Sequence, residues 1–502
     1  MGMRALLRLS AALLTVGCAS ASRSPGPELS ASRDDATVTF LHINDVYEIT
    51  PVEGGRAGGL ARVAALRARL ERERGEVIFT LGGDFVSPSA LGTASVGGQP
   101  LAGRQMVAVL NAAGLDWATL GNHEFDINEA LLKQRLAESR FRYVISNVTD
   151  TTGALFPRTE RRAVLEVRTR AGGTVRIGLV GTLTPVNRAA YVRYDDQYGA
   201  VRREVAALKD SVDAIVAITH QYYYEDDHLA SEIPELDLVL GGHEHENFLL
   251  RRGRQQAAIV KADGNARSAQ VVTLHFGARG SRPRVTTELV PITDALPSDS
   301  GVVREVEGWL TEAFAGYERS GFRPREIVTE LREGLDARES TIRYRPSNMT
   351  ELLLAAMKRE APAAEIGFFN AGSVRIDDVV PAGPITQYDI IRILPFGGPL
   401  VTVKVTGAVV AQTLLAARAN AGVGGYLHAY GARIDGDRVF VGDQPIEPER
   451  AYTVVTTDFL LTGRETRLGF FSTSNAAITG RTNLRDVRLP LIDELRARGA
   501  SR

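Results

Sequence analysis

The sequence predicts a two-domain α/β protein, in which a domain built on a buried, mostly parallel sheet precedes a smaller α+β domain. Its 502 residues exceed what one hydrophobic core usually organises. Between residues 37 and 300, short apolar runs alternate with helical segments, as in a sheet covered by helices. Beyond residue 325, several β-runs surround one strongly periodic helix.

The first predicted strand is "TVTFLHI" (37–43), which ends at Asn44-Asp45. Further strands are predicted where apolar runs stop at a glycine or a polar motif, and helices where apolar residues recur with helical spacing. These strands cover 76–81, 117–120, 174–181, 213–219 and 236–240, and the helices cover 59–75 and 104–114.

A long amphipathic segment (302–321) is predicted to be a helix that links the two domains. The second domain follows with a helix at 347–360 and with strands at 400–407 and 451–459. The predicted boundaries are a lipoprotein-type signal peptide over 1–18, a flexible tether over 19–36, the first domain over 37–300, the linking helix over 301–324 and the second domain over 325–502.

The first eighteen residues have the three-part build of a secretory signal. Arg4 and Arg8 precede a short apolar run, and small residues lead to Cys18, the sole cysteine of the chain. "TVGC" resembles a bacterial lipobox, although Thr15 stands where Leu is usual. We therefore predict export to the periplasm or cell envelope with a lipid anchor at Cys18, and plain export without the lipid is the alternative.

Composition excludes some classes of partner. The chain is 44% hydrophobic and 24% charged, as is ordinary for a soluble globular protein. A net charge of −1, with both signs interspersed, gives no basis for binding nucleic acid. The expected partner is a small molecule, the only membrane contact is the predicted lipid, and the sequence does not decide the oligomeric state.

Side chains that bind metals follow several strands of the first domain. They are Asp45, Asp84, Asn122, His220, His243 and His245. In α/β sheets, ligands bind outside the carboxyl ends of the strands. Carboxylates, an amide and imidazoles together suit Mn, Zn, Fe or Ni better than Ca or Mg. The glycines before Asp84, Asn122 and His243 are expected to permit the tight turns that expose them.

Each of these residues alone has a structural explanation, because an Asp after a strand is usually a turn former and a single His is usually a satisfied core residue. The set as a whole is harder to explain in this way. The chain has 8 histidines, and four of them lie at predicted strand ends: His123, His220, His243 and His245. The other four are expected to be structural: His42, His228, His275 and His428.

In this order, "ND", "GGD", "GNHEFD", "THQ" and "GGHEHE" resemble the motifs of the calcineurin-like metallophosphoesterases. In the second half, "RPSNMTELL", "FFNAGSVR", "ILPFGGPL" and "DFLLTGRE" resemble the C-terminal domain of the 5′-nucleotidases and bacterial UDP-sugar hydrolases. The resemblance covers the chain from about residue 37. It implies a four-layer α/β sandwich followed by a smaller α+β nucleotide-binding domain.

The resemblance also implies two divalent metal ions, Mn, Zn or similar, bridged by Asp84. One ion would be held by Asp84, Asn122, His220 and His243, and the other by Asp45, Asp84 and His245. A hydroxide that bridges the ions would attack phosphorus. His123, oriented by Asp126, would stabilise the transition state or protonate the leaving oxygen.

The first motif departs from the family pattern. Many members have Asp-x-His, where this chain has Asp45-Val46-Tyr47. A phenol with its ordinary pKa of about 10 is a poor ligand for such a metal. We therefore predict a more weakly held ion on that side, with a water in place of the histidine. Sequence spacing alone does not place Glu48 there.

By the same resemblance, the second domain holds the nucleotide. Phe459 would stack on the base, and Glu465 would bind the sugar or base. The aromatic partner on the other face of the base is expected near Leu400, which has no ring, and Arg464 replaces a glycine. The base pocket is thus predicted to be altered, and AMP is not fixed as the substrate. The residues implied for nucleotide binding are Arg345, Asn370, Arg375, Phe459 and Glu465.

These residues predict a secreted, metal-dependent phosphohydrolase that acts on a nucleotide or a related phosphate ester, in first place as a 5′-nucleotidase. A UDP-sugar diphosphatase, a 2′,3′-cyclic-nucleotide phosphodiesterase and a thiosulfohydrolase are the enzymatic alternatives. The alternative outside the enzymes is a nucleotide-binding lipoprotein with a degenerate metal site. By analogy with the family, helix 302–321 and its ends are the expected hinge between the domains.

Overall fold

The computed structural model describes residues 36–169, 173–186, 188–278 and 280–500. The predicted signal peptide with Cys18, and the predicted tether up to residue 35, lie outside these residues. Among the described residues, no helix combines the length and the apolar character needed to cross a membrane.

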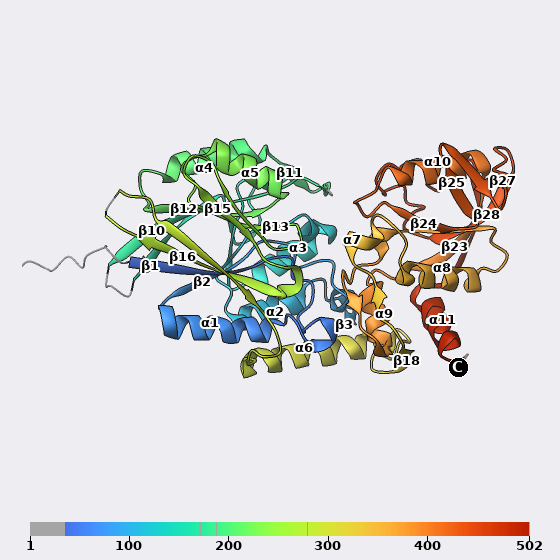
Figure 1. Ribbon diagram of the computed structural model, residues 1–502, viewed down its shortest axis with the longest axis horizontal. Coiled ribbons are helices and arrows are strands. Elements are labelled where there is room, and N and C mark those ends of the chain that lie inside the picture. Colours follow the sequence, from blue (N-terminus) through green and yellow to red (C-terminus); the bar gives the residue numbers. More distant parts are fainter. Residues whose placement is uncertain (1–35, 170–172, 187, 279, 501–502) are drawn as a thin grey trace, which may run out of the picture.

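Two large sheets form the first half of the structure (Figure 1). The seven-stranded sheet has the spatial order β17 (Arg284–Pro291), β16 (Ser268–Phe276), β1 (Ala36–Ile43), β2 (Val77–Leu81), β5 (Trp117–Ala118), β6 (Arg142–Val144) and β8 (Thr159–Glu160). The six-stranded sheet has the order β14 (Phe248–Arg252), β15 (Ala257–Lys261), β13 (Leu238–Gly242), β12 (Ala214–His220), β10 (Thr174–Leu183) and β9 (Arg162–Arg168).

The two sheets pack face to face through an apolar core, because their central strands are apolar on both faces. Phe40 of β1 belongs to the same buried cluster as Leu179 of β10 and Ile218 of β12. The alternate residues Leu41 and Ile43 point to the other face and pack with the helices there. Strands buried on both faces read as continuous apolar runs, which is why the sequence predicts them well.

Helices cover the outer face of each sheet and complete a four-layer sandwich (Figure 1). On one side lie α1 (Leu60–Arg74), α2 (Arg104–Ala113), α3 (Glu129–Glu138) and α6 (Ser300–Arg319). On the other side lie α4 (Gln197–Leu208) and α5 (Tyr223–Glu232). The predicted α/β sandwich is thereby confirmed. Short strand pairs complete this half, namely β3 (Ser95–Val96) with β4 (Gln99–Pro100), and β7 (Val148–Asp150) with β11 (Val192–Tyr194).

A five-stranded sheet between two helices organises the second half. Its order is β24 (Leu427–Tyr430), β20 (Ile366–Asn370), β28 (Ala451–Thr457), β23 (Pro399–Thr406) and β29 (Ile478–Asp486). Helix α8 (Asn348–Glu360) packs on one face and α10 (Gly407–Arg418) on the other. The remaining elements are β18 (Ile327–Leu331), β19 (Leu335–Asp336), α7 (Glu339–Ile342), β21 (Val379–Val380), β22 (Gly383–Thr386), α9 (Gln387–Ile393), β25 (Ala432–Asp435), β26 (Arg438–Val441), β27 (Gln444–Pro445) and α11 (Arg488–Ala500).

Helix α6 leads from the first half to the second, as the amphipathic segment 302–321 predicts. It begins after Asp299, whose carboxylate accepts hydrogen bonds from the backbone N–H groups of Gly301 and Val302. The hydroxyl of Tyr317, near its end, lies 2.9 Å from Thr93 Oγ1, so the helix is attached to the first half. The hinge role of this segment stays a prediction.

The parallel strands of both sheets direct their carboxyl ends to one edge. In the first sheet β1, β2 and β5 run parallel, and in the second sheet β12 and β13 run parallel. The segments that follow these strands therefore meet at one place, on the side of the sandwich that faces the second half (Figure 1).

Candidate metal centre

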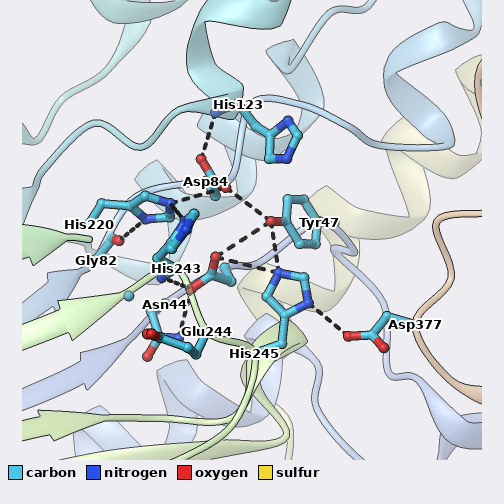
Figure 2. A network of polar contacts seen from close by, with 12 residues as sticks. Asn44, Tyr47, Gly82, Asp84, His123, His220, His243, Glu244, His245 and Asp377 are labelled. Atoms are coloured by element: carbon cyan, nitrogen blue, oxygen red, sulfur yellow. Dashed lines mark hydrogen bonds and ion pairs between the residues drawn. The ribbon is translucent and has the colours of Figure 1, made fainter. Parts of the chain in front are cut away.

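Four donor side chains lie around one point at this edge, and Figure 2 shows three of them, Asp84, His220 and His243. His220 Nε2 lies 3.2 Å from Asp84 Oδ2, 3.1 Å from Asn122 Oδ1 and 3.3 Å from His243 Nδ1. Asp84, Asn122 and His220 are at most 3% exposed to solvent. We call Asp84, Asn122, His220 and His243 the His220 side of the centre.

Asp84 also borders a second group of donors. The Tyr47 hydroxyl donates toward Asp84 Oδ2 at 3.2 Å and lies 3.2 Å from His245 Nε2 and 3.5 Å from Asp45 Oδ1. His245 Nε2 in turn lies 3.6 Å from Asp45 Oδ1. We call Asp45, Tyr47 and His245 the His245 side. The structure thus brings all six predicted donors together and adds a phenol.

The distances on the His220 side fit a divalent ion. Donors that share an ion at about 2.0–2.2 Å stand about 3.0–3.5 Å from one another. The three contacts of His220 Nε2, at 3.1, 3.2 and 3.3 Å, lie within this range. Two imidazoles, a carboxylate and an amide oxygen are a donor set for Mn, Zn or a similar metal.

The His245 side fits an ion less well, because Tyr47 places a protonated hydroxyl among its donors. Burial and the neighbouring carboxylates of Asp84 and Asp45 raise the pKa of Tyr47 well above its usual value. The phenol is therefore neutral in the metal-free protein. It stands where the family pattern has an imidazole.

Charge on the His220 side is balanced without a metal. Burial alone would lower the pKa of His220, but the carboxylates of Asp84 and Asp45 outweigh it and raise this pKa to about 10. Burial and the nearby His220 lower the pKa of His243 well below its usual value. The His220 imidazolium therefore offsets one of these carboxylate charges, and a metal ion must displace its proton.

Three donors are held in a left-handed backbone conformation that side chains rarely adopt. The φ angles are 52° at Asp45, 55° at Asp84 and 89° at His243. Such residues cost about 1–3 kcal/mol each and persist only where the surroundings fix them. A backbone N–H bond from His243 to Asp45 Oδ2, at 2.9 Å, is one such constraint, and it joins the two sheets.

Glu124 supplies a further constraint that the sequence analysis missed. Its buried carboxylate accepts bonds from the N–H groups of Asp84 (2.9 Å), Phe85 (2.7 Å) and Gly121 (2.6 Å). Burial and the Asp84 charge raise the pKa of Glu124 to about 7. The glutamate of "GNHEFD" thus joins this loop to the "GGD" loop. In the sequence, the position of Glu124 between a histidine and an apolar phenylalanine was the feature that could have indicated its burial.

The glycines of the donor loops act in two ways. Gly83 has a φ of +82°, as the tight-turn prediction requires. Gly121 and Gly242 are needed for close approach instead, which corrects the prediction for these two. A Cβ on Gly121 would lie 2.1 Å from Asp84 Oδ1, and one on Gly242 would lie 2.2 Å from the Gly82 carbonyl oxygen.

His123 stands beside the donors without joining them. Its backbone N–H donates to Asp84 Oδ1 at 2.8 Å, and its Nδ1 lies 2.6 Å from Asp126 Oδ2. Its Nε2 lies 3.2 Å from Arg375 Nη2, so a guanidinium of the second half reaches the centre. The structure therefore places the predicted His123–Asp126 pair and Arg375 together.

Comparison with known proteins agrees with this geometry. Residues 38–247 match the family model of the calcineurin-like phosphoesterases, and residues 327–472 match that of the 5′-nucleotidase C-terminal domain. Protein UshA of Yersinia enterocolitica is 24% identical over 91% of this chain and 90% of its own length. The 5′-nucleotidase of Bos taurus is 23% identical over 85% of this chain and 83% of its own.

Solved structures share the fold. A 5′-nucleotidase precursor from Thermus thermophilus superposes with a TM-score of 0.75 and 23% identity, and covers 92% of this chain and 97% of its own. The sulfate thiohydrolase SoxB of the same organism superposes with a TM-score of 0.67 and 19% identity, over 92% and 94%.

The chain is a calcineurin-like phosphoesterase with a 5′-nucleotidase C-terminal domain. The predicted family and fold class are confirmed. The chain is a metal-dependent phosphoester hydrolase, and divalent metals are the cofactors of its family.

Within the 5′-nucleotidase C-terminal domain, two predicted substrate residues contact each other. Asn370 Nδ2 donates to Glu465 Oε2 at 2.8 Å. Phe459 is 42% exposed, so its ring is accessible to a ligand. Arg345 is exposed as well, in the turn before α8. The structure does not join Arg345 to the Asn370–Glu465 pair by any contact among the described residues.

One expectation about the base pocket is wrong. Leu400 is fully buried in β23, where it belongs to the same apolar core as α8, so its side chain is not accessible to a ligand. Tyr426, a partly exposed aromatic residue missed in the sequence, lies close to the Asn370–Glu465 pair through its backbone, because its carbonyl oxygen accepts a 2.8 Å bond from the Ala371 N–H group. Its neighbour Gly425 approaches Glu465 so closely that a Cβ there would lie 2.7 Å from Oε1.

Residues that link the C-terminal domain to the centre also escaped the sequence analysis. Asp377 Oδ2 lies 2.7 Å from His245 Nδ1. Glu339 pairs with Arg375 at 3.4 Å and with Arg343. Glu48, considered as an extra metal ligand, binds Arg392 Nε at 3.2 Å instead.

A buried lysine, Lys261, binds the "GGHEHE" loop on the side away from the metal donors. Lys261 Nζ donates to the Gly242 carbonyl oxygen at 2.8 Å and to the Glu244 carboxylate, and it lies 3.0 Å from Asp226 Oδ2. Glu244, between the two histidines, thus turns away from the metal donors. The signal for this network was the lysine inside the apolar run "AAIVKA".

Proposed function

We propose that this hydrolase is a 5′-nucleotidase, which cleaves the phosphate ester of a small-molecule nucleotide. The arrangement that supports this most is the buried donor set of the His220 side, next to the His123–Asp126 pair and to Arg375 of the C-terminal domain. The relatives named 5′-nucleotidase align over most of their length, which adds support.

In this proposal, two divalent ions, Mn, Zn or similar, bind at the centre. The residues that hold them are Asp84, Asn122, His220 and His243 for one ion, and Asp45, Asp84 and His245 for the other. Such ions supply Lewis-acid chemistry, because they neutralise phosphoryl oxygens and make water a stronger nucleophile. Asp84 is suited to serve both ions, since its Oδ2 contacts His220 and Tyr47.

His123 is proposed to act on the leaving oxygen. Asp126 holds its Nδ1 at 2.6 Å, which leaves Nε2 as the nitrogen that faces the substrate. Protonation of the leaving ribose oxygen, or stabilisation of its developing charge, then falls to this nitrogen. Arg375, 3.2 Å from it, would bind phosphate oxygens through its planar guanidinium.

The C-terminal domain is proposed to bind the nucleoside. Asn370 and Glu465 offer an amide and a carboxylate side by side for ribose hydroxyls. Phe459 and Tyr426 offer rings for the base. Arg345 is proposed as a further anion-binding residue at the exposed rim. In this proposal the base stacks on one or both of these rings.

The test is phosphate release from 5′-AMP after metal removal by chelator and re-addition of Mn²⁺. UDP-glucose, 2′,3′-cyclic AMP, thiosulfate esters and an aryl phosphate are run in parallel, and their products are separated by chromatography, because the first cleavage of UDP-glucose or of the cyclic ester frees no inorganic phosphate. Metal-restored release from AMP, absent in His123→Ala, supports the 5′-nucleotidase. Preference for another ester assigns one of the alternative hydrolases. Nucleotide binding without hydrolysis of any ester would favour the binding lipoprotein.

We propose further that the protein is exported and anchored through a lipid at Cys18. The signal-like segment and the "TVGC" sequence support this. Incorporation of labelled palmitate into the wild type, and its loss in Cys18→Ala, is the expected result. Export without incorporation would leave plain secretion.

A further inference from the structure

Asp377 brings a carboxylate of the C-terminal domain to a candidate metal ligand of the first domain (Figure 2). Its Oδ2 lies 2.7 Å from His245 Nδ1. The other nitrogen of that ring, Nε2, faces Asp45 and Tyr47. The imidazole of His245 therefore stands between the metal donors and a residue 132 positions further along the chain.

The conformation of Asp377 is fixed by hydrogen bonds from both domains. Its backbone is left-handed, with a φ of 43°, which is costly for a residue that carries a side chain. Its carbonyl oxygen accepts a 2.6 Å bond from Arg267 Nη2 of the first domain. Its Oδ1 accepts a 2.8 Å bond from the Glu339 N–H group. These bonds leave Oδ2 directed at His245.

Two other histidines of the centre find the partner of their outer ring nitrogen within their own domain. His220 Nδ1 lies 2.7 Å from the Gly82 carbonyl oxygen, and His123 Nδ1 lies 2.6 Å from Asp126 Oδ2. The partner of His245 alone among these three comes from the other domain. The orientation of this ring thus depends on how the C-terminal domain is seated.

We propose that Asp377 is a positioning residue of the metal centre, which orients His245 for its ion and makes the affinity of that ion depend on docking of the C-terminal domain. A carboxylate on the outer nitrogen fixes the tautomer of a metal-binding histidine and raises its basicity. Separation of the domains would break this bond and deprive the His245 side of its oriented imidazole. The inference rests on the proposed metal-dependent function and adds a link between domain position and metal binding.

Two substitutions of Asp377 separate its carboxylate from its backbone. Asp377→Gly removes the carboxylate, and glycine adopts a φ of 43° without steric cost. Backbone strain therefore does not explain the effect of this substitution. Asp377→Asn keeps the shape of the side chain and replaces the carboxylate with an amide oxygen, which is a weaker hydrogen-bond acceptor for His245 Nδ1. Asp378→Asn is the matched control, because Asp378 also bonds to the first domain, at 3.2 Å from the Glu53 N–H group, and does not contact His245.

The experiment titrates the metal-free, full-length protein with Mn²⁺ and follows free Mn²⁺ by electron paramagnetic resonance. In Asp377→Gly, the weaker class of bound Mn²⁺ is expected to lose about 10–100-fold in affinity, as outer partners of metal ligands typically contribute. Asp377→Asn falls between it and the wild type. The tighter class and the melting temperature stay unchanged, and Asp378→Asn matches the wild type.

Three results would overturn the proposal. Equal affinities in Asp377→Gly and the wild type would show that the carboxylate does not position His245. An equal loss in Asp378→Asn would assign the effect to the domain contact in general. Loss of both ion classes together would indicate a global defect. A wild type that binds Mn²⁺ and hydrolyses no ester would instead count against the proposed function alone.

Discussion

The two sides of the metal centre share Asp84 and differ in how the chain builds them. The His220 side is made by the first domain alone, from loops that follow parallel strands of both sheets. The His245 side has a phenol among its donors and takes its outer carboxylate from the C-terminal domain. The donors of both sides therefore follow strands of the first domain, but the outer partner of His245 depends on the seating of the second domain.

The "GGHEHE" loop shows how one short sequence serves both sides. His243 and His245 point to different sides, while Glu244 between them is bound by Lys261 at the back of the loop. Two imidazoles of one motif thus have unequal surroundings. We expect a tightly held ion on the His220 side and a weaker ion on the His245 side.

The largest expected effect comes from His220→Ala. Removal of this ligand leaves Asp84 buried without its imidazole partner and deprives the tighter ion of a central donor. We expect hydrolysis to fall at least about 100-fold, and metal retained after dialysis to fall with it. Metal analysis and ester hydrolysis are measured together. His428→Ala, which removes a buried imidazole of the C-terminal domain, serves as the control.

His123→Ala separates catalysis from metal binding. His123 contacts Asp84 only through its backbone N–H, so both sides keep their donors. We expect kcat to fall about 10²–10⁴-fold, as for loss of a general acid. Metal content stays at the wild-type value. A variant with wild-type kcat would exclude His123 from the reaction, and one without metal would place it among the ligands.

Tyr47→His tests why the two sides differ. The substitution replaces a protonated phenol with an imidazole next to Asp84 and His245. Retained metal after dialysis is expected to rise from about one ion to about two ions per chain. Tyr47→Phe, which removes the hydroxyl without adding a ligand, stays near about one ion. Two ions in the wild type would show that the phenol does not weaken this side.

The smallest effect is a dependence of metal affinity on pH. In the metal-free protein, the carboxylates of Asp84 and Asp45 raise the pKa of His220 to about 10 against the effect of burial. Burial alone would lower the pKa of His245 as well. The carboxylates of Asp377, Glu339 and Asp45 outweigh this effect and raise the pKa to about 9. Both rings are therefore protonated at neutral pH, and metal binding must release these protons.

Affinity for Mn²⁺ should thus increase as pH rises from 6 to 8, by up to about tenfold per pH unit for each proton displaced. Calorimetry in buffers of different ionisation enthalpy counts the protons. Absence of proton release at pH 7 would mean that the two imidazoles are neutral before the metal binds. Asp377→Asn is expected to lower the proton count, because it removes a charge that holds the His245 proton.

The sequence by itself determined the sandwich and the six donors. Strands buried on both faces appear as uninterrupted apolar runs, and donors such as Asp84 and His220 follow those runs directly. Because parallel strands end at one edge of a sheet, residues far apart in the chain are brought together without further information. The departure from the family pattern at Tyr47 was visible in the sequence as well, and the weaker ion that it implies stays a prediction.

Tertiary structure decided which groups surround those donors. Only the seating of the C-terminal domain places Asp377 on His245 and Arg375 on His123, and only the packing of β23 buries Leu400. Glu48 forms an ion pair with Arg392 and does not join the metal donors. These contacts join segments whose spacing carries no periodic signal. Domain packing and loop conformation fix them, including positive φ angles at Asp45, Asp84 and Asp377 that residue type does not predict.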